Sequence, residues 1–267
     1  MKKLFSLFIT AVLITPCIAQ DTKANTKTKK EERKLRISAI AKQEEEGVIK
    51  YKKHTAFGLK LTTDGYGGFL EVARAQSVKR SLLFQLDIAE RKHPKEEKTQ
   101  YISQYAFPTS PIIFGKLNFF YPVKIGVQQQ FLLGNKGNKN GVSITGNLGG
   151  GLIAGLLRPY QIEVQTDSTL TYVKYDPNDT AQTFLNPAGY NRGPGLGKGW
   201  NQLKVTPGLY VKTALRFDFG KYNELVNAAE VGLTAEFYSR KIPQMVFNKE
   251  KQFFLSAYVS ILFGKRK

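Results

Sequence analysis

The chain has 267 residues, enough for one large domain or two ordinary ones. Its 40 Lys and Arg residues exceed its 21 Asp and Glu residues, so the formal net charge at pH 7 is +19. Such an excess often indicates a polyanionic partner, of which nucleic acid is the commonest. An export signal at the N-terminus argues against nucleic acid, which leaves an anionic membrane surface or an acidic protein.

The first residues have the pattern of a secretory signal peptide. Lys2 and Lys3 precede an apolar run over 4–14, and the small residue Ala19 offers a cleavage site. The apolar run is too short for a spanning helix. We therefore predict a signal peptide over residues 1–19. Cleavage after Ala19 removes Cys17, the only cysteine, so the mature chain has no disulfides or thiol chemistry.

Residues 20–54 form a charged segment, with a basic run over 27–34 and an acidic run over 44–46. Such a composition offers little that could pack into a core, so a disordered stretch or a frayed helix is expected. A periplasmic tether or docking arm is the functional alternative.

The last apolar stretch, residues 252–264, alternates strictly between two kinds of side chain. One set is apolar throughout: Phe253, Leu255, Ala257, Val259, Ile261 and Phe263. The other set is smaller and mildly polar: Phe254, Ser256, Tyr258, Ser260 and Leu262. A strand with one apolar face is typical of a lipid-facing barrel wall, where about 9–11 residues cross the hydrocarbon layer. An inner strand of a soluble β-sandwich is the alternative.

The same alternation recurs from residue 55 onward. It predicts eight strands, over 56–62, 70–73, 82–89, 113–130, 142–156, 203–219, 230–237 and 252–264. The parity holds from Ile113 to Gln130, so that segment is expected to be a single strand. Long loops at 90–111 and 165–202 alternate with short connections, as in outer-membrane barrels. We predict an all-β, eight-stranded antiparallel transmembrane β-barrel over 55–267 in the outer membrane, with both termini periplasmic.

The predicted inward faces carry as many acidic as basic residues. The basic set is Lys60, Lys116, Lys124, Lys212 and Arg216, and the acidic set is Glu71, Asp87, Asp218, Glu230 and Glu236. An unpaired buried charge costs several kcal/mol, so these groups are expected to pair across strands and fill the lumen. In particular, Lys212 and Arg216 are expected to reach Glu230 and Glu236. A narrow ion or small-solute channel is the alternative.

Catalytic and metal-binding patterns are weak. The two histidines are His54, expected at the periplasmic lip, and His93, expected in an outer loop. A hydrolase acting on lipid at the barrel rim would need a nucleophile beside one of them, and the sequence places none there. Two histidines without a mature cysteine also argue against a typical zinc site. We therefore predict a non-enzymatic protein with no cofactor and no metal.

The basic excess is expected to face lipid or protein. Basic residues gather at the predicted periplasmic turns and the C-terminus: Lys79, Arg80, Lys136, Lys139, Lys265, Arg266 and Lys267. Such rims favour anionic headgroups, including those of outer-membrane lipid and lipopolysaccharide, or an acidic partner protein of the envelope.

Several stretches are similar to a known family. Residues 115–121, 155–160, 201–210 and 253–267 resemble a family of small outer-membrane β-barrel proteins from Bacteroidota. The resemblance implies a barrel without a catalytic motif, serving as a structural or accessory partner in an envelope complex. Because small barrels of these bacteria include accessory parts of the type IX secretion system, protein secretion is the process that the analogy suggests.

Overall fold

The computed structural model describes residues 34, 38, 52–100, 110–137, 141–166, 169–195, 197–220 and 224–267. The chain divides into two compact units, Met1–Ile49 and Lys50–Lys267. The predicted signal peptide over 1–19 and most of the charged segment 20–54 lie outside the described residues, so both stay predictions. Among the described residues, no helix has the length and apolarity that crossing a membrane requires.

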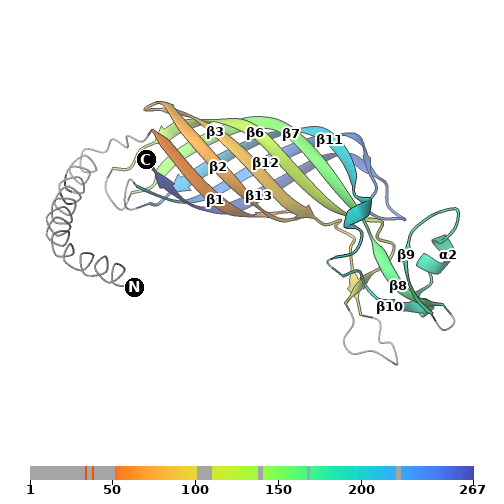
Figure 1. Ribbon diagram of the computed structural model, residues 1–267. Helices are drawn as coiled ribbons and strands as arrows, with labels where there is room; N and C mark the ends of the chain where they lie inside the picture. The colour runs from red at the N-terminus through yellow and green to blue at the C-terminus, as the bar shows by residue number, and fades with distance from the viewer. Residues whose placement is uncertain are drawn as a thin grey trace, which may run out of the picture. The chain divides into compact units, whose positions relative to one another are not determined.

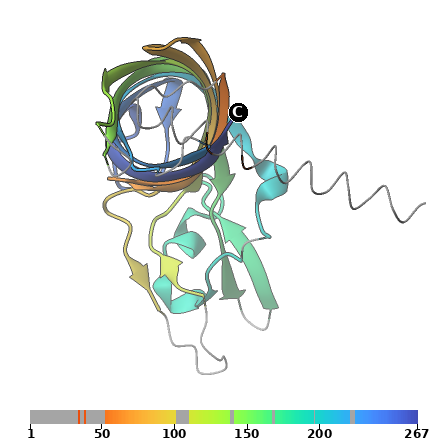
Figure 2. The same cartoon turned by 90° about the vertical axis from the view of Figure 1, so that its left-hand side faces the viewer.

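The second unit is built on eight long strands that close into a ring (Figure 1). They are β1 Lys53–Thr62, β2 Gly65–Ser77, β3 Arg80–Arg91, β6 Asn118–Gly134, β7 Ser143–Pro159, β11 Lys204–Asp218, β12 Leu225–Ile242 and β13 Lys251–Arg266. Every neighbouring pair is antiparallel, in the order β1-β13-β12-β11-β7-β6-β3-β2. Figure 2, which looks into the ring, shows its closure. The predicted eight-stranded antiparallel barrel is confirmed.

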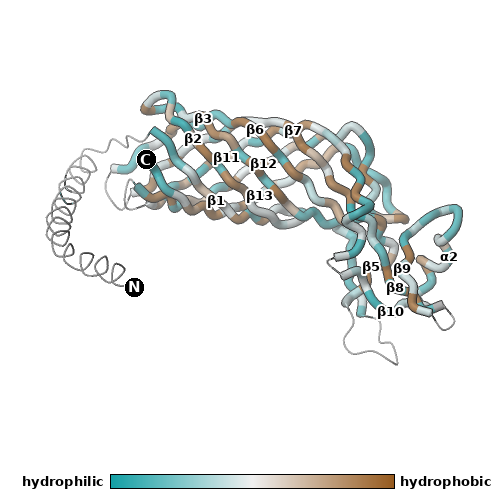
Figure 3. The backbone as a smooth tube through the Cα atoms, in the orientation of Figure 1, coloured by the Kyte–Doolittle hydropathy of each residue, from teal (hydrophilic) through white to brown (hydrophobic). Residues whose placement is uncertain are grey.

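The outer face of the barrel is apolar. Side chains alternate between interior and exterior along each strand, and Figure 3 shows apolar residues recurring along the wall. Leu61, Leu152 and Leu255 are 70%, 68% and 66% exposed. Other exposed apolar side chains of the wall are Phe57, Leu59, Leu70, Ile88, Ile125, Leu148, Val205, Leu209, Val211, Val231, Leu233, Val259 and Ile261. The barrel is therefore inverted relative to a water-soluble protein, which buries such residues.

The two ends of the barrel differ. One end, which we call the short-turn end, carries the connections 78–79, 135–142 and 219–224 and the C-terminus of β13. The other, the long-loop end, carries the connections 92–117 and 160–203. The predicted alternation of long and short connections is thus present, with both long segments at the same end (Figure 1).

The strand predicted over 113–130 begins later than its parity indicates. Gly115 has a φ of +68°, a left-handed conformation that glycine adopts readily and that ends the extended run. Before it, β5 (Ile112–Ile113) pairs with β4 (Lys98–Thr99) outside the barrel. Ile113, expected to face outward, is 5% exposed. The prediction was wrong here because Ile112 and Ile113 belong to a second hydrophobic core outside the barrel. Their positions in the sequence continue the barrel alternation by chance.

The segment 165–202, predicted as a loop, is folded over its described residues. A three-stranded sheet in the order β10-β8-β9 joins β8 (Gln161–Thr166), β9 (Thr169–Lys174) and β10 (Tyr190–Arg192). Short helices complete it: α2 (Ala181–Phe184), η1 (Pro187–Gly189) and η2 (Trp200–Gln202). We call the described residues of 92–117, 160–203 and 243–250 the extension.

The extension has a hydrophobic core separate from the barrel lumen. The buried members are Ile112, Ile113, Tyr160, Ile162, Val164, Phe184, Tyr190 and Met245. They come from all three connections that make up the extension. Sequence patterning missed this core because its members are scattered over more than one connection and form no periodic run.

Candidate functional site

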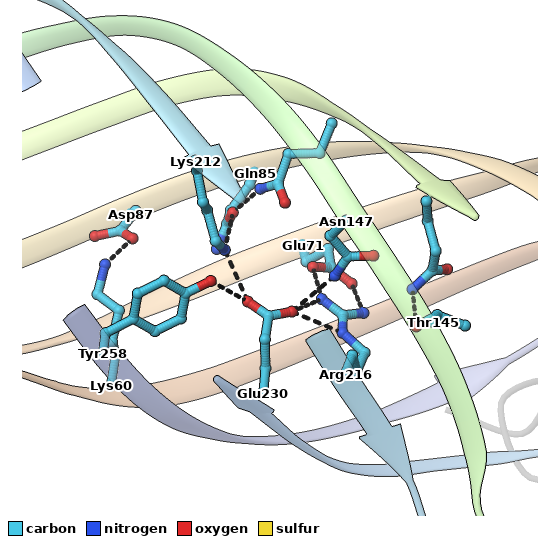
Figure 4. Close-up of polar contacts among 12 residues, drawn as sticks. Lys60, Glu71, Gln85, Asp87, Thr145, Asn147, Lys212, Arg216, Glu230 and Tyr258 are labelled. Atoms are coloured by element: carbon cyan, nitrogen blue, oxygen red, sulfur yellow. Dashed lines mark hydrogen bonds and ion pairs between the residues drawn. The ribbon is translucent and has the colours of Figure 1, made fainter. Parts of the chain in front are cut away.

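The barrel lumen is filled by side chains in three zones, and it is the candidate functional site. An apolar cluster occupies the long-loop end: Phe120, Ile153, Leu157, Tyr210, Tyr238, Ile242 and Phe254. A second apolar cluster occupies the short-turn end: Ala56, Phe69, Val226, Ala228 and Leu262. Charged and amide side chains fill the zone between them (Figure 4). An eight-stranded ring has an interior of a size that side chains can fill.

Glu230, on β12, is fully buried and accepts hydrogen bonds on both carboxylate oxygens. Its Oε1 lies 2.9 Å from Lys212 Nζ and accepts from the Tyr258 hydroxyl at 2.7 Å. Its Oε2 lies 2.7 Å from Arg216 Nη2 and accepts from Asn147 Nδ2 at 2.8 Å. The structure thus brings Lys212 and Arg216 against Glu230, and two cations compensate one buried carboxylate (Figure 4).

Arg216 connects opposite sides of the ring. Besides Glu230 it donates to both oxygens of Glu71, at 2.7 and 2.6 Å. Glu71 lies on β2, which stands four places from β11 around the eight-stranded order. His54 Nε2 lies 3.0 Å from Glu71 Oε1, so Glu71 is also tied to β1. The bidentate fork of a guanidinium suits this bridging role better than a lysine would.

Glu236 forms a second charged centre nearer the long-loop end. Lys124 Nζ lies 2.6 Å from Oε1, and Arg91 donates to both oxygens at 2.8 and 3.0 Å. The Tyr238 hydroxyl also donates to it at 2.8 Å. Arg91 in turn lies 2.6 Å from the Asp64 carboxylate. The cations at Glu236 are therefore Lys124 and Arg91, and the expected partners Lys212 and Arg216 lie at Glu230 instead.

Lys60 and Asp87 pair across the lumen side of β1 and β3. Between this pair and Glu230, Gln85 accepts from Lys212 Nζ at 3.0 Å and from the Gln128 amide. Amide groups therefore extend the ion pairs into a network that crosses the lumen (Figure 4).

Two of the predicted lumen residues lie away from this network. Asp218 is at the short-turn end, where it pairs with Arg266 and lies 3.7 Å from Lys136. Lys116 is outside the lumen, because the chain turns at Gly115 before the barrel strand begins. It pairs with Glu96 of the extension at 2.6 Å, and burial lowers its pKa while the carboxylate opposes that shift. The prediction of a lumen position for Lys116 was wrong.

Sequence reasoning missed several members of the network. Arg91 was assigned to the loop 90–111, although it continues the inward parity of Asp87 and Ala89 and could have been found by it. His54 was expected at the periplasmic lip, and it lies at the short-turn end of β1, but its burial against Glu71 was not foreseen. Tyr258 was assigned to the inner face without a partner. No local pattern could have paired it with Glu230.

The arrangement of the lumen pairs its charged groups with one another and leaves none of its described carboxylates without a cation. Each lumen carboxylate described above has one or more cations as ion-pair partners, so it is engaged within the lumen. His93, the other histidine, accepts from the Lys95 N–H on Nδ1 at 3.2 Å and lies in the extension. Within the described part of the chain, no three His, Cys, Asp or Glu side chains gather in a way that could hold a metal ion.

Comparisons with known proteins give structural likenesses only. No family model and no curated protein matches the chain. Its fold is similar to Neisserial surface protein A (TM-score 0.39, 8% identity, covering 80% of this chain and 96% of that one). It is also similar to the N-terminal β-barrel domain of OprF from Pseudomonas aeruginosa (TM-score 0.36, 9% identity, covering 80% of this chain and 99% of that one).

A third likeness is to Ail, the attachment invasion locus protein of Yersinia pestis, solved in complex with the heparin analogue sucrose octasulfate. There the TM-score is 0.37 at 10% identity, and the match covers 82% of this chain and 100% of that one. At TM-scores this low, none of the three likenesses establishes a shared function.

Replacing Glu230 by Gln tests the energetic weight of the network. The change leaves Lys212 and Arg216 with one fewer carboxylate in a buried setting, which costs about 3–5 kcal/mol. We expect a clear fall in the urea midpoint of the protein refolded in detergent micelles. Glu250→Gln removes the same charge from an exposed position and should shift stability by less than about 0.5 kcal/mol. Equal midpoints for the two variants would contradict the assignment.

Proposed function

We propose that this protein is a sealed integral barrel of the outer membrane that acts as a non-enzymatic structural or accessory partner in an envelope complex. The observation that carries the proposal is the inverted distribution of side chains. The wall is apolar outside, and the charges lie inside. In water, such a continuous apolar band would drive association, whereas in a bilayer it matches the hydrocarbon.

The dimensions of the wall suit a bilayer. The barrel strands have 10 to 18 residues, and about 9–11 residues of a tilted strand cross the hydrocarbon layer. Short connections at the end that carries the C-terminus match the periplasmic turns of bacterial barrels, and the long connections match their outer loops. We therefore propose periplasmic termini and an extension on the outer side.

The filled lumen favours a structural role over transport. Its charges are engaged with one another, and apolar side chains also pack in clusters toward both ends. An ion entering this interior would have to displace a compensated pair, which costs several kcal/mol.

The extension supports the partner role. It holds its own core at the long-loop end, and the strands β9 and β10 form the two edges of its sheet. Edge strands offer unpaired backbone groups to a further strand, a common mode of protein recognition. We propose that an envelope protein binds here, and we propose protein secretion as the process on the basis of the family resemblance.

Membrane insertion is tested by placing Arg at the middle of the apolar wall. Leu152 is 68% exposed and lies near the centre of β7, where Arg costs about 2–4 kcal/mol in a bilayer. We expect Leu152→Arg to lower the fraction of protein that folds into lipid vesicles, read from heat-modifiable gel migration. Val78→Arg, in a turn at the barrel end, is the control and should fold like the parent. Equal folding of the two variants would argue against a membrane wall.

Planar-bilayer recording tests the sealed lumen. Because the interior is filled, the reconstituted protein should give no steady conductance above that of the protein-free bilayer. A porin reconstituted in parallel shows that insertion is detectable. Steady single-channel currents from the purified protein would favour the narrow-channel alternative.

Partner binding is tested at the edge strand β9. Leu170 is 57% exposed there, and a lysine on an edge strand disfavours strand addition. We expect affinity-tagged protein from detergent-solubilised outer membranes to retain an envelope protein, and Leu170→Lys to reduce its recovery several-fold. Leu133→Lys, at the opposite end of the barrel and 63% exposed in the parent, should retain it. A barrel that is always recovered alone would contradict the partner role.

A further inference from the structure

The barrel wall has a notch at the long-loop end, above the turn that joins β1 to β2. Pairing of β1 with β13 ends at Thr62, and the Thr63 N–H donates to Ala257 O at 2.9 Å. β13, however, begins at Lys251. Over the described residues, the stretch 251–256 therefore has β12 on one side and no strand on the other.

A segment following β3 forms the far side of the notch. β2 and β3 pair up to Arg91, and the next N–H, that of Lys92, donates to Asp64 O at 2.7 Å. The chain then passes over the β1–β2 turn through His93. Between this segment and β13 lies a cavity of about 250 Å³. Its lining includes Phe254, which faces the lumen, and Phe253 and Leu255, which are exposed on the wall.

The lining of this cavity has two chemical sides. Phe253 and Leu255 lie on the apolar outer face and are 56% and 66% exposed. On the polar side, the cations are Arg91, Lys92 and Lys251, and the only acidic lining residue is Asp64, which Arg91 already engages. Since Arg91 also engages Glu236, the lining cations that no carboxylate of the described residues pairs with are Lys92 and Lys251, and these two give the cavity its positive charge.

Hydrogen-bond donors also collect in the cavity. His93 accepts on Nδ1 from the Lys95 N–H, which places its ring proton on Nε2. Burial, and next the charge of Lys251, lower the pKa of His93, so the ring lies within the field of that lysine.

The unpaired edge of β13 adds backbone donors. Ala257 directs its carbonyl toward β1, and backbone groups alternate sides along an antiparallel strand. Phe253 and Leu255 share the parity of Ala257, so their N–H groups face the notch. Cations and N–H donors that face the same space together favour an anion with several acceptor oxygens.

We propose that this notch binds the phosphorylated headgroup of an outer-leaflet amphiphile, whose acyl chains run down the wall along Phe253 and Leu255. The inference rests on the proposed membrane insertion, with the long-loop end on the outer side. The headgroup phosphate sits among Lys92, Lys251 and the N–H groups of Phe253 and Leu255. The apolar side chains beside it select a lipid over a free phosphate ion.

The test is calorimetric titration of the full protein in maltoside micelles with dihexanoyl phosphatidic acid. This lipid should bind at least about tenfold more tightly than dihexanoyl phosphatidylcholine or inorganic phosphate, since charge-assisted hydrogen bonds to the exposed phosphate are worth about one decade or more. Lys251→Gln should weaken its binding about tenfold. Lys249→Gln, an exposed lysine of the same loop outside the lining, should leave it unchanged.

A second pair of variants tests the acyl contact. Leu255→Ser should weaken phosphatidic acid several-fold, and Val259→Ser, further along the same outward face and outside the lining, should not. Equal affinity for phosphatidylcholine, or unchanged binding by Lys251→Gln, overturns the inference and leaves the open edge of β13 to a peptide strand. Equal affinity for inorganic phosphate overturns the lipid as the occupant.

The failure of this inference is distinguishable from failure of the proposed function. Heat-modifiable migration and vesicle insertion, measured on the same preparations, report on the barrel alone. A protein that inserts but does not prefer phosphatidic acid refutes the notch site only. A protein that folds in water and does not enter vesicles refutes both.

Discussion

The guanidinium of Arg216 holds two carboxylates from different walls of the barrel, Glu71 on β2 and Glu230 on β12. A closed ring of strands fixes the backbone, but it does not by itself decide what fills the centre. The central filling is set by the requirement that every buried charge meet an opposite one. Glu230 and Glu236 each meet two cations, so the buried charges of the lumen compensate one another.

The apolar side chains fall into two main groups outside the lumen, one on the barrel wall and one in the extension. The apolar side chains of the outer wall are exposed, so they contribute nothing to a conventional core. The extension therefore builds a separate core from its own connections, anchored by residues such as Tyr160 and Ile162 directly after β7. This division explains how a small barrel carries a folded extension.

Strand alternation made most of the barrel predictable. The parity of β13 and β11 separates the exposed apolar residues of the wall from the residues that face the lumen, because the two faces of each strand meet different surroundings. Alternation could not reveal where Ile113 leaves the barrel, since an apolar residue buried in the extension keeps the same parity. It also could not pair Glu236 with Arg91, because contacts across a lumen depend on ring order and register and leave no local signal.

The seam of the ring joins β1 to β13, so His54 lies opposite Arg266 at the two ends of the described barrel. The wall therefore cannot close until the final strand of the polypeptide has arrived. Assembly depends on contacts between residues far apart in sequence, which makes it slow compared with a helical bundle. Until that moment both the β1 and β13 edges are open, and open strand edges of this kind are prone to aggregation.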